Sequence, residues 1–146
     1  MIDDQDRLVL LKQTRPGRAP CWKTPGGGIE RTDNSIEAAL HRELAEELGA
    51  EAMVTAQVFL CSLPWDTGIV VHHIFVARLT KLDESARSGP EFSDPSRGEY
   101  EPDRVELRGD DLASIDLKPA ALKEFILANR EALLAEAANI NPNGLA

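Results

Sequence analysis

The sequence predicts a fold of the α/β (α+β) class, in which one mixed sheet packs against helices. Residues 7–12, 52–60 and 68–79 are rich in aliphatic and β-branched side chains, which is typical of buried strands. Two other segments, residues 36–48 and about 119–138, carry apolar side chains at helical spacing. The chain therefore alternates between strands and amphipathic helices.

Composition limits the domain count and the classes of partner. With 146 residues and 42% hydrophobic content, the chain predicts a single domain over residues 1–146. The net charge of −9 argues against nucleic acid, whose phosphates require a basic face. The chain has two cysteines, an acidic start and no apolar run long enough to span a membrane. We expect a cytoplasmic protein with reduced thiols and no membrane partner; a homodimer is one possible state.

The first part of the chain is expected to run from a strand into a glycine turn. Residues 7–12 predict the strand, and residues 14–20, with two prolines and a glycine, predict a loop. Residues 25–28 read Pro-Gly-Gly-Gly, which suits neither a helix nor a central strand. The bare backbone of this turn can approach a ligand closely.

A helix follows the glycine turn. Asn34 is predicted as its N-cap, with Glu37 as the capping-box partner, and Gly49 ends it. The core-facing stripe of this helix consists of Ile36, Leu40, Leu44 and Leu48.

The later elements are two strands, a long loop and a second helix. Within the second strand, residues 69–77 are expected to be well buried. Residues 81–103 contain few apolar side chains and several prolines, which predicts a loop of about 20 residues. A short strand at 105–107 follows, and Pro119 is predicted as the first residue of a helix that runs to about Ala138.

Three glutamates on the first helix indicate a metal site. Glu43, Glu46 and Glu47 stand at i, i+3 and i+4, so their side chains share an arc of roughly 100°. Like charges this close repel one another, and a divalent cation such as Mg²⁺ removes the repulsion. Arg42 is placed to orient one of the carboxylates. A solvated acidic helix with an Arg–Glu pair would explain these residues equally well, but it leaves the adjacent glycine turn unexplained.

This segment resembles the box of the Nudix hydrolases, G-x5-E-x7-R-E-U-x-E-E-x-G-U, where U is a bulky apolar residue. The second half is matched by Arg42, Glu43, Leu44, Glu46, Glu47 and Gly49, and the small Ala50 fills the last position. The first half departs from the pattern, because Asn34 occupies the position of its first glutamate and Gly28 that of its glycine. The common spelling PGGxxE fits Gly26, Gly27 and Glu30 with one residue inserted within 31–34.

The resemblance covers roughly residues 5–135 and implies a MutT-like Nudix fold, an α/β/α sandwich with a mixed sheet. The box lies at about residues 26–50 and the C-terminal helix at about 119–138. The family's strand before the acidic turn at residues 3–6 is missing or shortened here. A misassigned start, a truncated chain or replacement by another chain's strand would each explain this, because an unpaired inner edge is a liability.

The resemblance also implies a reaction and a set of residue roles. The reaction is Mg²⁺-dependent hydrolysis, with Mn²⁺ as an alternative, of a pyrophosphate bond in a nucleoside diphosphate linked to another group X. The metal ligands are Glu43, Glu46, Glu47 and the carbonyl of Gly26 or Gly27. Glu43 is expected as ligand or general base, beside Arg42. The base is alternatively an acid of the long loop, Glu99 or Glu101, although both also suit ordinary solvated positions.

Substrate-binding candidates lie outside the box. Arg15, Arg18 and Lys23 are near enough to the glycine turn to hold phosphates, and Trp65 is a candidate for stacking on a base. Solvated charges and simple packing are the competing interpretations. For the whole chain, the rivals to an enzyme are a non-catalytic nucleotide-binding or regulatory Nudix domain and an unrelated acidic interaction module.

Overall fold

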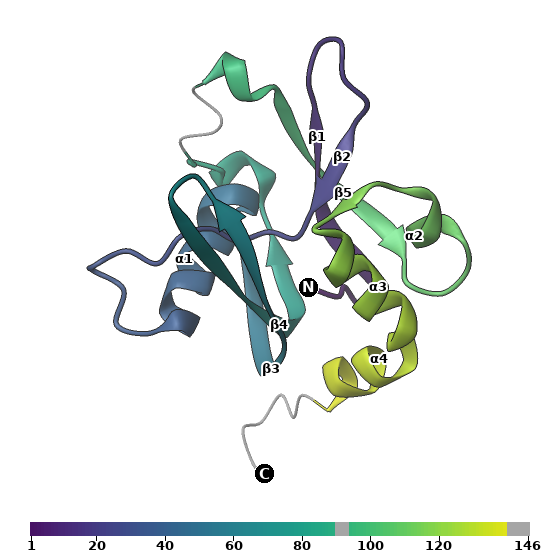
Figure 1. Ribbon diagram of the computed structural model, residues 1–146. Coiled ribbons are helices and arrows are strands. Elements are labelled where there is room, and N and C mark those ends of the chain that lie inside the picture. Colours follow the sequence, from purple (N-terminus) through teal and green to yellow (C-terminus); the bar gives the residue numbers. More distant parts are fainter. Residues whose placement is uncertain (90–93, 140–146) are drawn as a thin grey trace.

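The β-structure consists of a four-stranded sheet and a long two-stranded hairpin (Figure 1). The computed structural model describes residues 1–89 and 94–139. In the sheet, the order is β5-β1-β2-β6, and only the β2–β6 pair is parallel, so the sheet is mixed as predicted. Its strands are β1 (Arg7–Thr14), β2 (Cys21–Lys23), β5 (Glu99–Glu106) and β6 (Leu117–Lys118), and the hairpin strands are β3 (Ala50–Trp65) and β4 (Gly68–Leu82).

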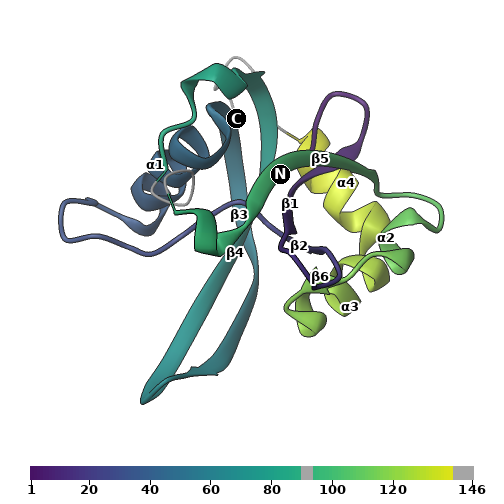
Figure 2. The same cartoon turned by 90° about the horizontal axis from the view of Figure 1, so that it is seen from above.

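Helices cover both faces of the β-structure, as Figure 2 shows. On one face, α1 (Ile36–Leu48) packs Leu44 and Leu48 against Val9 and Leu11 of β1. The alternate β1 side chains face a second core with α3 (Ala120–Ala128) and α4 (Arg130–Ala138). A short helix, α2 (Asp111–Ser114), adds Leu112 to this second core. The predicted α/β/α sandwich is therefore confirmed.

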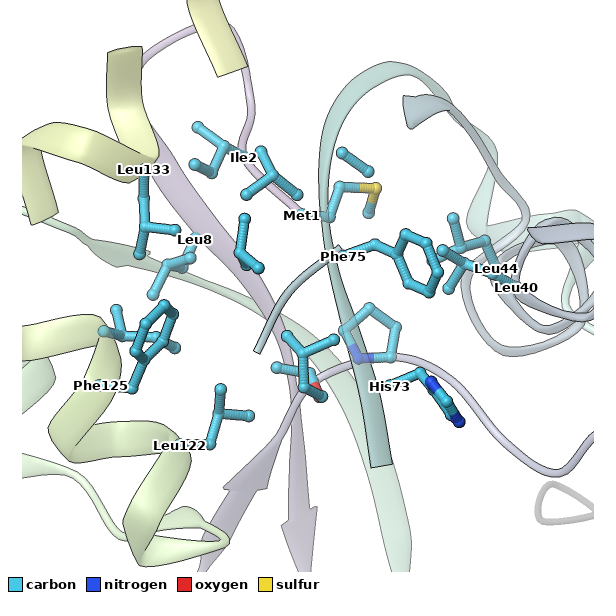
Figure 3. A pocket seen from close by; sticks show the side chains of 17 residues that line it. Met1, Ile2, Leu8, Leu40, Leu44, His73, Phe75, Leu122, Phe125 and Leu133 are labelled. Atoms are coloured by element: carbon cyan, nitrogen blue, oxygen red, sulfur yellow. The ribbon is translucent and has the colours of Figure 1, made fainter. Parts of the chain in front are cut away.

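Residue 2 links the hairpin to the sheet. The Ile2 backbone N–H donates to the Ala77 carbonyl at 2.8 Å, and Leu79 N–H donates to the Ile2 carbonyl at 2.9 Å. Ile2 also forms a bridge with Leu8 of β1. The expected N-terminal strand is thus represented by isolated bridges. An apolar cavity of about 80 Å³ lies beside this link, between β4 and the helices, and Phe75 and Phe125 are among its lining residues (Figure 3).

The two ends of α1 have different caps, and only the second was predicted correctly. The N-cap is Ser35 rather than Asn34: its extended backbone and its hydroxyl, which accepts from Ala38 N–H at 3.0 Å, start the helix. The capping-box position is then Ala38, so Glu37 is not the capping partner. At the other end Gly49 adopts φ 62°, the left-handed cap that ends the helix as predicted.

The predicted long loop is mostly ordered structure. β4 extends to Leu82, and β5 begins at Glu99 and pairs with β1 through all of its residues. The described residues between them include the 3-10 helices η1 (Glu84–Ala86) and η3 (Pro95–Arg97), and residues 90–93 of the predicted loop lie outside the described residues. The predicted strand at 105–107 is the end of β5.

The predicted C-terminal helix is two helices. Asn129 adopts a non-helical backbone (φ −126°, ψ 23°), and its side-chain amide donates to the Phe125 carbonyl at 2.8 Å, so α3 stops there and α4 begins at Arg130. Pro119 caps α3 and is not its first residue. No described helix combines the length and the apolar character that crossing a membrane requires. Cys21 and Cys61 are free thiols.

Candidate active site

The glycine turn lies directly against the acidic face of α1. The Gly26 backbone N–H donates to Glu47 Oε2 at 2.7 Å. A Cβ added to Gly27 would lie 2.4 Å from the carboxyl carbon of Glu43, far inside van der Waals contact. A side chain at Gly27 would therefore displace the Glu43 carboxylate, which occupies that space. Turn and helix form one unit.

Arg42 gathers two of the three acids. Its Nη1 donates to Glu43 Oε1 at 2.9 Å and to Glu46 Oε2 at 3.3 Å. Its Nη2 donates to the Gly28 carbonyl at 2.8 Å, which fastens the glycine turn to the same guanidinium. The Glu43 side chain is only 14% exposed, against 33% for Glu46, so Glu43 lies deeper in the site. Arg42 thus holds the carboxylates and the turn together.

Asp33 supplies a carboxylate that the sequence pattern did not identify. Arg42 donates to it through two parallel bonds, Nε to Oδ1 at 3.0 Å and Nη2 to Oδ2 at 2.9 Å. The Glu30 backbone N–H donates to the same carboxylate at 2.7 Å. The Asp33 side chain is 6% exposed, whereas Glu30 is 62% exposed and 3.6 Å from Arg42. The acid missing at Asn34 is therefore present one residue earlier.

The Arg42–Asp33 pair fixes the charge of both groups. Hydrogen bonding from Arg42, followed by that from the Glu30 N–H, lowers the pKa of Asp33 below its ordinary value. The hydrogen bond to Asp33, with a further contribution from Glu43, raises the pKa of Arg42. At neutral pH the guanidinium is therefore fully charged and available to orient Glu43 and Glu46.

The donor set fits a hard divalent cation. Within residues 1–89 and 94–139, no three His, Cys, Asp or Glu side chains already stand in a geometry ready for a metal. The glutamates accept instead from Arg42 and from the Gly26 N–H. Carboxylate oxygens beside a turn with bare backbone are nevertheless the ligands that Mg²⁺ prefers. The Glu43 carboxylate lies in the space where a side chain of Gly27 would be, so this carboxylate and the turn backbone are direct neighbours.

Arg87 ties the far end of α1 to the sheet. Its Nε donates to the Glu47 carbonyl at 2.8 Å and its Nη2 to the Tyr100 carbonyl at 2.7 Å. The Ser88 N–H donates to the Glu46 carbonyl at 2.9 Å. The last carbonyls of the helix are thus satisfied by the segment after β4, which fixes the position of the acids along the helix axis.

Lys23 and Arg15 lie on the α1 side of the sheet. Lys23 pairs in register with Leu11, which belongs to the core under α1. Its ammonium lies 4.9 Å from the centre of the Tyr100 ring and 3.4 Å from the Tyr100 hydroxyl. Arg15 Nη2 donates to Oε1 of the buried Gln13, two residues before it on β1. Both cations therefore remain substrate-binding candidates, and Tyr100 joins them as a residue that the sequence did not suggest.

The other candidates are placed elsewhere. Arg18 lies in the exposed connection between β1 and β2. Glu99 and Glu101 lie on β5 opposite Thr14 and Lys12 rather than on a loop. Because successive strand residues alternate between faces, both acids point to the side away from α1. Their interpretation as loop acids near the box was wrong, since pairing with β1 makes this segment a strand.

Trp65 ends β3 at the tip of the hairpin. Its side chain is 72% exposed. Among the described residues, no hydrogen bond or ring contact joins Trp65 to the box glutamates.

Comparison with known proteins decides the family. The family model described as NUDIX domain matches residues 1–116, most of the chain. The chain belongs to the Nudix family. The family's general activity is hydrolysis of nucleoside diphosphates linked to another group, so this Nudix protein is a pyrophosphohydrolase, and Nudix hydrolases generally use divalent metal ions.

Solved structures agree with the fold. A NUDIX hydrolase from Nitrosomonas europaea has a TM-score of 0.69 at 15% identity, over 99% of this chain and 94% of that one. The E. coli ORF135 protein has a TM-score of 0.61 at 24% identity (90% and 87% covered). A MutT NUDIX hydrolase from Burkholderia pseudomallei has a TM-score of 0.55 at 24% identity (87% and 90% covered). No curated protein matches the sequence.

The substitution Asp33→Asn tests the acid that replaces Asn34. Because the folded-state pKa of Asp33 is depressed, its contribution to stability is present above the unfolded pKa of about 4 and disappears as pH falls through the folded value. We expect Asp33→Asn to lower the free energy of unfolding at pH 7 and to leave that energy less dependent on pH below about 4. Urea titrations from neutral to acidic pH measure both effects.

Asp4→Asn is the control for the charge change, because it also removes one carboxylate, from an exposed position. Equal pH profiles for Asp33→Asn and wild type would contradict the assignment.

Proposed function

We propose that this Nudix protein catalyses Mg²⁺-dependent hydrolysis of a pyrophosphate bond in a nucleoside diphosphate linked to X. Substrates of this class are nucleoside triphosphates, damaged nucleotides and nucleotide sugars. The observation that carries the proposal is the contact of one guanidinium, that of Arg42, with Glu43, Glu46 and the glycine turn. Three crowded carboxylates on one helix repel one another and gain favourable interactions when an added cation neutralises them.

Glu43, Glu46 and Glu47, with the carbonyl of Gly26 or Gly27, are the proposed ligands of Mg²⁺ or Mn²⁺. When bound, the cation supplies positive charge for the phosphate oxygens as the reaction proceeds. An acidic protein of net charge −9 would otherwise repel a diphosphate, so the cation also makes binding favourable.

Glu43 is the proposed general base, because it lies deeper in the site than Glu46 and is oriented by Arg42. In the reaction, a water oxygen forms a bond to phosphorus while the bond to the bridging oxygen breaks. The water proton passes to the Glu43 carboxylate, and the leaving group departs as a phosphate. Glu99 and Glu101 are less suitable bases because the alternation of β5 directs them away from α1.

Lys23 and Arg15 are the proposed contacts for the substrate phosphates. Both belong to the face of the sheet that carries α1, and Lys23 is held by the Tyr100 ring and hydroxyl. A lysine ammonium held in place in this way loses less freedom when it binds an anion. The cytoplasmic location and the absence of nucleic-acid partners stay predictions from the sequence.

The competing function is a non-catalytic nucleotide-binding domain, which the missing acid at Asn34 had favoured. Asp33 weakens that argument because its two carboxylate oxygens accept two parallel hydrogen bonds from Arg42. A domain that only binds nucleotide would also have no use for a base at Glu43.

Replacement of the box glutamates tests the metal mechanism. The assay offers nucleoside triphosphates, deoxynucleoside triphosphates, ADP-ribose, NADH, nucleotide sugars and dinucleoside polyphosphates with Mg²⁺ or Mn²⁺, and identifies the products. We expect Glu43→Gln to lower kcat by at least about 10²-fold. Glu46→Gln and Glu47→Gln should raise the metal concentration needed for half-maximal rate by roughly 10- to 100-fold.

The control is Glu37→Gln, an exposed glutamate in the first turn of the same helix, which should retain wild-type kinetics. Undiminished turnover in EDTA would overturn the metal mechanism, and no release from any substrate would favour the non-catalytic domain.

Replacement of Lys23 tests the phosphate contact. Lys23→Ala should raise KM by about tenfold with a smaller change in kcat, because a charge-assisted bond to bound substrate is lost. Lys12→Ala is a matched control, since Lys12 is the neighbouring strand lysine on the opposite face, 5.4 Å from the Trp22 ring. Equal KM changes in the two variants would remove Lys23 from the substrate site.

A further inference from the structure

The outer half of the β3–β4 hairpin projects from the body of the molecule, as Figure 2 shows. We call residues 60–73 the arm. All residues from 64 to 71 are exposed, so the prediction that residues 69–77 are well buried was wrong for residues 69–71. An isolated two-stranded ribbon is only marginally stable in water, so we expect an arm of this kind to pack against another molecular surface.

The exposed surface of the arm is apolar. Among the described residues, eight large hydrophobic side chains are exposed, and five of them lie on the arm: Leu60, Trp65, Ile69, Val70 and Val71. Trp65 and Ile69 are each 72% exposed. From residue 59 to residue 77 the only side chain with a formal charge is Asp66, in a protein of net charge −9. The arm is therefore the region where two copies of this chain can approach with the least repulsion.

The register of the hairpin sorts these side chains into two faces. Cross-strand partners share a face, and the pairs Pro64–Ile69, Ser62–Val71 and Leu60–His73 place Leu60, Ile69 and Val71 together. Trp65 and Val70 lie on the other face, through the pairs Trp65–Gly68 and Leu63–Val70. The bulges of the hairpin fall between residues 51 and 59, so the alternation is regular throughout the arm.

Of the two strands of the arm, β4 has the edge better suited to pairing. The outer edge of β3 includes Pro64, which has no N–H to donate. On β4, the edge away from β3 is bridged by Ile2 at Arg78, and along Gly68–Val71 the described residues provide no second strand at that edge. This stretch contains no proline, and β-branched residues occupy three of its four positions, which favours strand pairing.

We propose that two copies of this chain associate through β4, whose Gly68–His72 stretches pair antiparallel about a twofold axis at Val70. A twofold axis perpendicular to the joined sheet leaves each side chain on the same face in both copies. Odd-numbered residues therefore lie opposite odd-numbered residues, and even-numbered residues opposite even-numbered ones. With Val70 opposite its counterpart, Ile69 lies opposite the partner's Val71, and apolar side chains meet on both faces. A shift of the axis to Val71 would place Ile69 opposite a histidine instead.

This arrangement separates the charged tips. Each Asp66 lies beyond one end of the paired stretch, so the two carboxylates are at opposite ends of the four-stranded ribbon. Because the pairing covers about five residues per copy, it buries less than the roughly 800 Å² per partner of a standard interface. We therefore expect a dimer that dissociates in the micromolar range.

Sedimentation velocity of the full chain over roughly 1 to 100 µM tests the proposal. Wild type should shift from monomer to dimer across this range. Val70→Lys places two like charges on the axis and should remain monomeric. Met53→Lys is the matched control, because Met53 is also a β-strand residue with 37% exposure, but lies on β3 outside the arm. This control should dimerise like wild type.

A second variant guards against misfolding of Val70→Lys. The pair Ile69→Thr and Val71→Thr retains β-branched side chains and should weaken dimerisation at least tenfold with an unchanged circular dichroism spectrum. If wild type remains a monomer throughout the range, the proposal is overturned. Binding of that monomer to phosphatidylglycerol vesicles would show that the arm contacts lipid and not a second copy, which overturns the proposal as well. A dimer that Val70→Lys and the threonine variant leave intact overturns it as well.

Discussion

The site depends on one guanidinium. Arg42 contacts Asp33 through two hydrogen bonds, Glu43 and Glu46 through Nη1, and the glycine turn through the Gly28 carbonyl. Each of these partners would be less well defined without it: the turn lacks side chains to pack, and the acids repel one another. A planar group with five donors suits this task, whereas a lysine would satisfy one partner at a time. In this arrangement the positive charge of the Arg42 guanidinium is shared among the acids that it contacts.

The alternation of β1 determines which side chains lie on each side of the sheet. On β1, Val9 and Leu11 face α1 while Leu8 and Leu10 face the C-terminal helices, so the strand alternation divides the molecule into two cores. The side with α1 carries Lys23, Tyr100 and the box acids, and the other side carries Trp22 with its bond to Asp103 at 2.7 Å. The polar residues of the first side can therefore serve a ligand without disturbing the larger core.

The sequence predicted α1 and the positions of its acids well because the helix has strong local signals. The apolar stripe and Gly49 define where it runs and where it ends. Its start was misplaced by one residue because Asp33, Asn34 and Ser35 are all suitable caps, and only the backbone decides among them. The role of Asp33 depends on a contact nine residues away, which periodicity does not report.

Other errors arose where tertiary contacts override local preference. Residues 99–106 contain four acids and a proline, yet they form a strand because every position pairs with β1. Asn129 interrupts an otherwise helical pattern by bonding to the backbone of the preceding turn.

In the proposed mechanism, Glu43 and the glycine turn build a cation site together. The most direct measurement is the affinity for Mn²⁺, by electron paramagnetic resonance, of Gly27→Ala and Gly28→Ala. A Cβ on Gly27 would meet the Glu43 carboxylate at 2.4 Å, whereas a Cβ on Gly28 would meet no atom within 4 Å. If Glu43 and the turn form one cation site, Gly27→Ala weakens Mn²⁺ binding by roughly 10- to 100-fold, whereas Gly28→Ala keeps an affinity near that of wild type. A wild-type affinity for Mn²⁺ in both variants would contradict a cation site shared by Glu43 and the glycine turn.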